Sequence, residues 1–166
     1  EIMPSLVGSE MCIRDSLGNH DCLGTGTKAY QVTFGNPDFA FIAGRVKFVC
    51  LNTNAIEYDY SQPVPNFDFI KAEWTNRADE FDRSVVCMHA PPFSEQFNNN
   101  VAEPFNDYIH KLPQLMFCLD GHGHHIRIQD LYEDGTIFYM TASAKERKYY
   151  IFTITPDDFS YEIIDF

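Results

Sequence analysis

The chain has 166 residues, of which 45% are hydrophobic and 15% aromatic, enough for one sizeable core and hence a single domain. Its 24 acidic and 12 basic residues give a formal net charge of −12. This charge repels polyanions, so we expect no long nucleic acid as a partner. A small phosphorylated substrate is compatible with it if bound metal ions supply positive charge locally.

The cysteines and the apolar runs exclude two further classes of protein. Five widely spaced cysteines with no Cys-x-x-Cys pair do not form a small disulfide-rich scaffold, so we expect buried free thiols. They are Cys12, Cys22, Cys50, Cys87 and Cys118. No run approaches the roughly 18 consecutive apolar residues of a membrane-spanning helix, so we expect no membrane span. The sequence indicates neither a localisation nor an oligomeric state.

The first residues differ in character from the rest of the chain. Residues 11–15 read Met-Cys-Ile-Arg-Asp, which matches the translation of a transposon end used to fragment DNA for sequencing. We therefore interpret residues 1–16 as a non-native segment and residues 17–166 as a partial domain that lacks its upstream portion. An ordinary flexible tail is the alternative.

Alternating apolar residues and turn signals predict the secondary structure in chain order. Two strands over 39–43 and 46–51 flank a tight turn, and a helix is predicted over 65–81. A strand over 83–88 ends at two prolines, which cannot continue a ladder, and a second helix over 101–112 ends at a proline. The remaining strands are predicted over 115–119, 126–132, 136–141, 149–154 and 159–164. This order indicates an α/β sandwich with mixed sheets.

Histidines are grouped in a way that suggests chemistry. Five of the six fall in three short clusters: Gly18-Asn-His-Asp21, His89-Ala-Pro-Pro92 and Gly121-His-Gly-His-His125. Each cluster follows or adjoins an apolar run or a glycine turn. Open α/β sheets place ligands beyond the carboxyl ends of their strands, and imidazole and amide donors suit a divalent transition metal. The clusters therefore predict a metal site.

In order and in residues, the three clusters closely resemble the later motifs of the calcineurin-like metallophosphoesterase family. These motifs are Gly-Asn-His-Asp/Glu, a strand ending in His before Pro-Pro, and Gly-His-x-His. Leu51-Asn-Thr53 is similar to the family's Leu-Asp/Asn-Thr, so the resemblance spans Leu17 to Phe166. It implies a calcineurin-like mixed β-sandwich flanked by helices, here without its N-terminal βαβ portion. It also implies hydrolysis of phosphomonoesters or phosphodiesters at a centre of two divalent metal ions.

The resemblance also assigns roles to individual residues. Asn19, His89 and His122 would bind one metal ion, and His124 would bind the other. His20 would contact the phosphate and protonate the departing oxygen. Manganese, iron and zinc all suit such donors. The family's Asp-x-His and Gly-Asp-x-x-Asp motifs do not occur upstream of the first cluster, so we expect an incomplete site and a poorly active chain.

Several neighbouring residues have two interpretations. Asp21 either orients the adjacent histidine or caps the turn. Asn52 and Asn54 either support the ligands from behind or form a turn after their strand. His125 lies either behind the ligands or on the rim. The histidine of the second predicted helix, His110, is expected on the surface.

Other functions are compatible with the same residues. A degenerate metal-binding or protein-interaction module could keep the scaffold without catalysis. A structural zinc domain is less favoured, because such a site needs a closed ligand shell. Loops over 54–66 and 94–101 are expected to form the rim of the site and to select the substrate, which the sequence does not identify.

Overall fold

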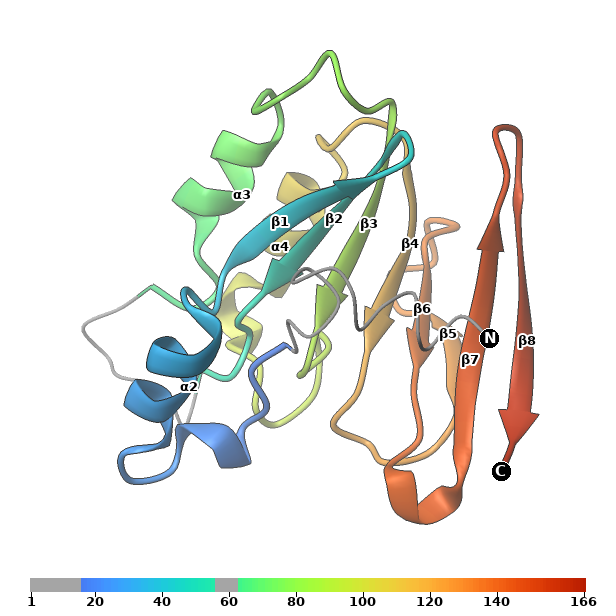
Figure 1. The fold of residues 1–166 in the computed structure, drawn as a ribbon. Coiled ribbons are helices and arrows are strands. Elements are labelled where there is room, and N and C mark those ends of the chain that lie inside the picture. The colour runs from blue at the N-terminus through green and yellow to red at the C-terminus, as the bar shows by residue number, and fades with distance from the viewer. Residues whose placement is uncertain (1–15, 56–62) are drawn as a thin grey trace.

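The computed structural model describes residues 16–55 and 63–166. These residues form a mixed α/β protein with a six-stranded mixed sheet, a separate two-stranded hairpin and three α-helices (Figure 1). None of the helices in the described ranges has the length and apolar character needed to cross a membrane. The interpretation of residues 1–16 as non-native falls, except for Ser16, outside the described residues.

The six-stranded sheet has the order β1-β2-β3-β4-β6-β5. Its strands are β1 Phe39–Ala43, β2 Val46–Leu51, β3 Arg83–Met88, β4 Leu115–Asp120, β5 Arg127–Asp130 and β6 Ile137–Met140. The central pairs β2-β3, β3-β4 and β4-β6 are parallel, whereas β1 and β5 are antiparallel edge strands. The carboxyl ends of β2, β3 and β4 therefore meet at one edge of the sheet.

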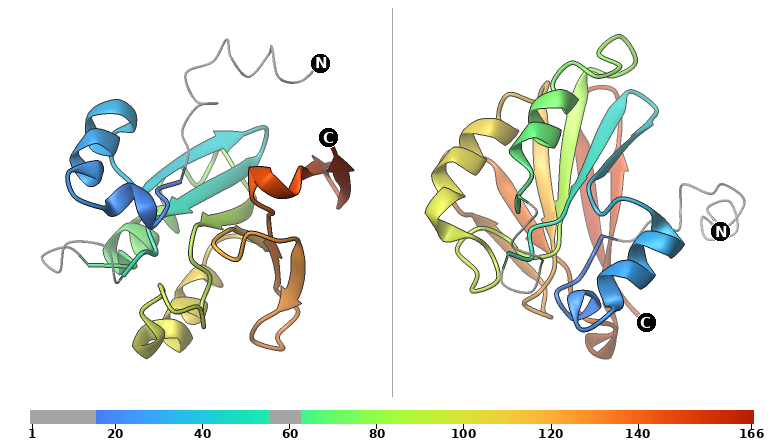
Figure 2. Two further views of the ribbon diagram at one scale, coloured as in Figure 1. Left: turned by 90° about the horizontal axis from the view of Figure 1, so that it is seen from below. Right: turned by 90° about the vertical axis from the view of Figure 1, so that its left-hand side faces the viewer.

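Two cores cover the two faces of this sheet. Helices α3 (Phe67–Glu73) and α4 (Ala102–Ile109) pack on one face, where Ile70 and Phe105 contact the strands in a fully buried cluster. The hairpin of β7 (Lys148–Ile154) and β8 (Phe159–Asp165) packs on the other face, around the buried ring of Phe117. Figure 2 shows the helices and the hairpin on opposite sides of the sheet.

Most predicted strands are confirmed to within one or two residues. The strand predicted over 126–132 is shorter, because residues 131–135 turn toward β6. Helix α2 (Gly26–Phe34) was not predicted, since it buries only Tyr30 and so has little apolar periodicity. It packs with Leu17 and Cys22 in a small core of its own.

The helix predicted over 65–81 is wrong in its second half. The first half forms as expected, with Asn66 accepting a hydrogen bond from the Phe69 amide. The helix ends early because the buried ammonium of Lys47 binds the backbone carbonyls of Glu73 and Asn76. Arg77 then adopts a left-handed φ of 58°, which the helix cannot continue through.

The described cysteines are free thiols, as predicted. Cys22, Cys50 and Cys118 are buried, and Cys87 is half-buried. The fifth, Cys12, lies outside the described residues.

Candidate metal centre

Three of the predicted metal ligands meet at the carboxyl edge of the sheet. His89 follows β3, His122 follows β4, and Asn19 lies in the turn that precedes α2. The Asn19 Oδ1 atom is 3.0 Å from His89 Nε2, and His122 Nδ1 is 3.4 Å from the same nitrogen. The two imidazole rings lie edge to face, with centroids 5.3 Å apart. His89 and His122 follow Asn19 by 70 and 103 positions in the sequence. In the fold, the donor atoms of Asn19 and His122 nevertheless both lie beside His89 Nε2.

These separations suit a shared metal ion. Ligand atoms about 2.0 to 2.2 Å from a metal, at angles of about 90° to 110°, lie about 2.9 to 3.5 Å from one another. Both distances around His89 Nε2 fall in this range. The amide oxygen of Asn19 and the two imidazoles are therefore spaced as neighbours in one coordination shell.

His89 is held in the protonation state that metal binding requires. Burial, which has the largest effect, and the nearby His122 lower the pKa of His89 to about 4, against an opposing effect of Asp21. His124 and His20 also depress this pKa, so both lie within electrostatic reach of His89. At neutral pH the His89 imidazole is uncharged and offers a ring nitrogen as a ligand.

The other predicted site residues lie around these three without touching them. His20 and His124 are exposed, and within residues 16–55 and 63–166 no hydrogen bond joins either side chain to the three donors. His125 is exposed and its Nδ1 faces the Gly123 carbonyl. The structure thus brings together three of the four predicted ligands and leaves His124 beside them on the rim.

The Gly121-His-Gly-His-His125 loop is conformationally strained. His122 and His124 both have φ of 63°, in the left-handed region that costs a non-glycine residue roughly 1 to 2 kcal/mol. A Cβ on Gly123 would lie 2.4 Å from Met140 Sδ, so any other residue here would require the Met140 side chain to move. Such strain is typical of functional sites, where surrounding structure holds the backbone in place.

The residues that follow β2 hold two of the ligand loops. The fully buried Asn54 side chain donates to the Leu17 carbonyl at 2.6 Å and to Asn52 Oδ1 at 3.1 Å. Thr53 Oγ1 accepts a hydrogen bond from the Ala90 amide at 3.0 Å. Asn52 Oδ1 also accepts from the Asn54 amide, which closes a turn. The two asparagines therefore form a turn, and Asn54 also joins this turn to the loop that carries Asn19.

Asp21 acts as a cap. Its Oδ2 accepts a hydrogen bond from the Gly18 amide at 2.9 Å and closes the turn that carries Asn19. Among the described residues no hydrogen bond joins Asp21 to His20. A Cβ on Gly18 would lie 3.0 Å from this oxygen and 3.6 Å from His89 Cε1, so a larger residue would push the Asp21 carboxylate aside by a few tenths of an ångström.

A cleft of about 400 Å³ opens beside His89, lined by Gly18, Asp21, Asp120 and Gly121 among others, and by no lysine or arginine. Asp120 ends β4 and is only 4% exposed. Burial raises the pKa of Asp120 to about 7, and its Oδ1 has no hydrogen-bond partner among the described residues. Buried polar atoms normally have partners, so an unpaired carboxylate oxygen beside histidines fits a cation site.

Sequence reasoning missed two acidic residues here. Asp120 was visible only as an acidic residue that ends an apolar strand. Glu95 belongs to the predicted rim loop, and its Oε1 lies 2.7 Å from His122 Nε2. No spacing rule connects Glu95 with a histidine 27 residues later.

His110 lies away from this centre. Its Nε2 is 2.8 Å from Thr136 Oγ1, and its Nδ1 is 3.0 Å from the Asn106 carbonyl. These contacts link the end of α4 to the start of β6, so the role of His110 is structural.

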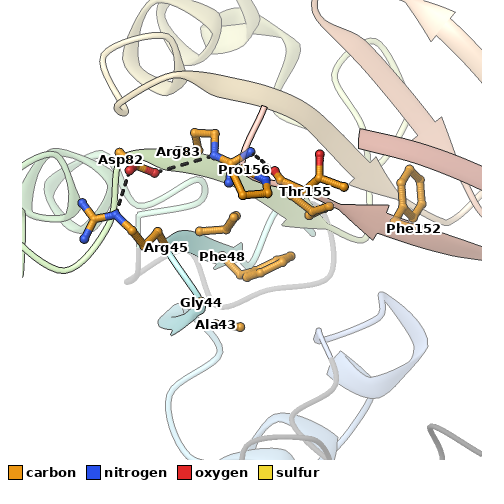
Figure 3. A pocket seen from close by; sticks show the side chains of 11 residues that line it. Ala43, Gly44, Arg45, Phe48, Asp82, Arg83, Phe152, Thr155 and Pro156 are labelled. Atoms are coloured by element: carbon orange, nitrogen blue, oxygen red, sulfur yellow. Dashed lines mark hydrogen bonds and ion pairs between the residues drawn. The ribbon is translucent and has the colours of Figure 1, made fainter. Parts of the chain in front are cut away.

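A second hollow of about 430 Å³ lies at the opposite end of the sheet, against the hairpin (Figure 3). Its charged groups are already paired with one another. Asp82 lies 2.8 Å from Arg45 Nε and 3.6 Å from Arg83 Nε, and Arg83 also donates to the Thr155 carbonyl. No histidine is among its lining residues, so metal chemistry is not expected there.

Within residues 16–55 and 63–166, no group of three or more His, Cys, Asp or Glu side chains is arranged to hold a metal ion. The trio described above contains only two such side chains, because its third member is an asparagine. Comparisons of the chain with protein-family models and with curated proteins found no match. The functional inference therefore depends on the motifs and on the geometry of their donor atoms.

Proposed function

We propose that this chain is part of a calcineurin-like metallophosphoesterase, which hydrolyses phosphomonoesters or phosphodiesters. One observation carries the proposal: donor atoms of three separate motifs lie close together, with Asn19 Oδ1 3.0 Å and His122 Nδ1 3.4 Å from His89 Nε2. The mixed sheet with a hairpin on one face and helices on the other supports the proposed sandwich fold.

Asn19, His89 and His122 would hold one divalent ion, and His124 would contribute to a second. Bound manganese, iron or zinc ions would lower the pKa of water and neutralise charge on the phosphoryl oxygens. The carboxyl group of Asp120, whose pKa burial raises to about 7, lines the same cleft. Among the described residues no lysine or arginine lines the cleft, so it would depend on cations to attract a phosphate group.

His20 is suited to move the proton. It is exposed and within electrostatic reach of His89, and among the described residues no side chain hydrogen-bonds to its ring. The ring is therefore available to donate a proton to the departing oxygen as the phosphoester bond breaks. His89 does not compete for this role, because burial holds its pKa near 4 and keeps it neutral.

A metal-binding or protein-interaction module without catalysis is the second candidate. Within residues 16–55 and 63–166 no group of three or more His, Cys, Asp or Glu side chains is arranged to hold a metal ion. A centre without such a group would hold a second ion poorly. This candidate predicts metal binding without turnover.

The 166-residue chain and its His89→Ala variant distinguish these functions. Binding of Zn²⁺ and Mn²⁺ would be measured by calorimetry, and turnover with an aryl phosphate monoester and a diester. We expect metal binding that weakens at least about tenfold in His89→Ala, and slow metal-dependent turnover that this variant abolishes. His110→Ala is the matched control, because this histidine lies outside the site.

Each result has a distinct meaning. His20→Ala should bind metal normally and lose turnover. Metal binding without any turnover would favour the non-catalytic module. Equal metal affinity in the wild type and in His89→Ala would refute the proposed centre.

A further inference from the structure

We propose that Glu95 is a positioning residue that fixes His122 as a metal ligand through Nδ1. Glu95 Oε1 lies 2.7 Å from His122 Nε2, whereas His122 Nδ1 faces His89 Nε2 at 3.4 Å. The two ring nitrogens of His122 thus have different partners on opposite sides. This inference rests on the proposed metal centre and adds a residue to it.

The Glu95 contact selects one tautomer of His122. An ionised carboxylate only accepts hydrogen bonds, so the neutral imidazole carries its proton on Nε2. The lone pair of Nδ1 then points toward His89 Nε2. Ligand histidines commonly donate their second ring nitrogen to a carboxylate, which fixes the tautomer and the orientation of the ring.

The Glu95 side chain is exposed, but its backbone is anchored on both sides. Ser94 donates its amide hydrogen to the Pro91 carbonyl, and Gln96 accepts at its carbonyl from the Ala55 amide at 2.9 Å. Phe97 is 3% exposed and packs edge to face on Phe105. Because neighbouring residues are fixed, the carboxylate reaches His122 at a small cost in conformational entropy.

His122 needs such a constraint. Its backbone is in the left-handed region, and its ring has hydrogen-bond contacts only with Glu95 and His89 among the described residues. Without Glu95 the ring could rotate or change tautomer and withdraw Nδ1 from the other donors. Glu95 acts through His122 and is not itself placed among the proposed ligands.

The test compares the wild type with Glu95→Ala, Glu95→Gln and the control Glu103→Gln. Glu103 is an exposed glutamate in the first turn of α4 and contacts no histidine among the described residues. Zinc affinity would be measured by competition with a chromophoric chelator. The tautomer of His122 in the metal-free protein would be read from ¹⁵N NMR of its imidazole.

We expect Glu95→Ala to bind zinc about 10- to 100-fold more weakly and to lose the single Nε2-protonated tautomer. Glu95→Gln, which retains an acceptor oxygen, should lose less than about tenfold. Glu103→Gln should match the wild type. Thermal unfolding checks that every variant is folded, as the exposure of both glutamates predicts.

Two outcomes would overturn the inference in distinguishable ways. If the wild type binds zinc, and Glu95→Ala binds it within twofold with the same tautomer, the role of Glu95 is wrong and the metal centre stands. If neither the wild type nor His89→Ala binds zinc, the metal centre itself is wrong, and the inference falls with it.

Discussion

Asn54 joins the end of β2 to the loop that carries Asn19, so replacing it tests how the fold holds the proposed site. Asn54→Ala removes hydrogen bonds to the Leu17 carbonyl at 2.6 Å and to Asn52 Oδ1 at 3.1 Å. Each bond contributes about 1 kcal/mol, and leaving the buried Leu17 carbonyl without this donor costs about 1 to 3 kcal/mol. Asn54 Oδ1 is itself buried without a partner, so removing it offsets about 1 kcal/mol of this loss of stability. We expect a net loss of about 2 to 4 kcal/mol in the free energy of unfolding.

The same change should weaken metal binding. Asn19 lies two residues after Leu17, and its Oδ1 is 3.0 Å from His89 Nε2. Ordering one released residue costs about 1 to 2 kcal/mol, which corresponds to roughly tenfold in affinity. Urea denaturation followed by circular dichroism gives the stability, and chelator competition gives the zinc affinity.

Two further variants control this experiment. Asn100→Ala changes an exposed asparagine and should alter stability by less than about 0.5 kcal/mol. Asn54→Asp keeps the shape but replaces the donor by an acceptor, so it should be as harmful as alanine. If Asn54→Ala costs less than about 1 kcal/mol and leaves zinc affinity within twofold, the proposed link is wrong. A loss of stability without a loss of affinity would limit Asn54 to the fold.

Two other predictions concern buried charges. Lys47 Nζ lies 2.9 Å from Glu73 Oε2 with both side chains buried, so Lys47→Met should lower the free energy of unfolding in urea by about 3 to 5 kcal/mol. A loss no greater than that of the exposed Lys145→Met would contradict this, and adding Glu73→Gln should restore part of it. Burial raises the pKa of Asp38 from 3.8 to about 6, despite a hydrogen bond from the Asn52 amide. As the pH rises, the unfolded chain therefore releases the Asp38 proton before the folded chain does. The stability that protonated Asp38 contributes below pH 3.8 is lost as the pH rises to about 6. Asp38→Asn should gain up to about 3 kcal/mol over the wild type at pH 8 and little at pH 3.5; an equal difference at both pH values would contradict the argument.

The strands of this fold are predictable because their signals are local. Alternation of apolar residues and a turn at Gly44, whose φ is 61°, define the β1-β2 hairpin without reference to the rest of the chain. The end of α3 is not local, since it depends on a lysine in β2 that binds the carbonyls of Glu73 and Asn76. Helix α2 was missed for the opposite reason: it lies mostly in solvent and has almost no apolar face.

The contacts of the candidate site are likewise of two kinds, those that local sequence patterns predict and those that they do not. His89 and His122 meet because parallel β3 and β4 end at one edge of the sheet, which strand patterns and motifs predict. Glu95 reaches His122 through a loop whose path depends on the packing of Phe97. His124 is exposed and has a left-handed φ of 63°, which a non-glycine residue does not reveal in the sequence. Contacts that depend on loop paths are therefore the part that needed the structure.

Charge connects the proposed centre to its proposed substrate. A chain with a net charge of −12 repels a phosphate anion, and the cleft beside His89 adds the carboxylates of Asp21 and Asp120. The same carboxylates attract cations, and the neutral imidazoles and the Asn19 amide bind them without adding positive charge of their own. Divalent ions held there would reverse the sign of the local potential only where the donors converge. The phosphate group would then be bound and activated at the same point. An acidic protein with no lysine or arginine among the described residues of this cleft could therefore act on phosphoesters.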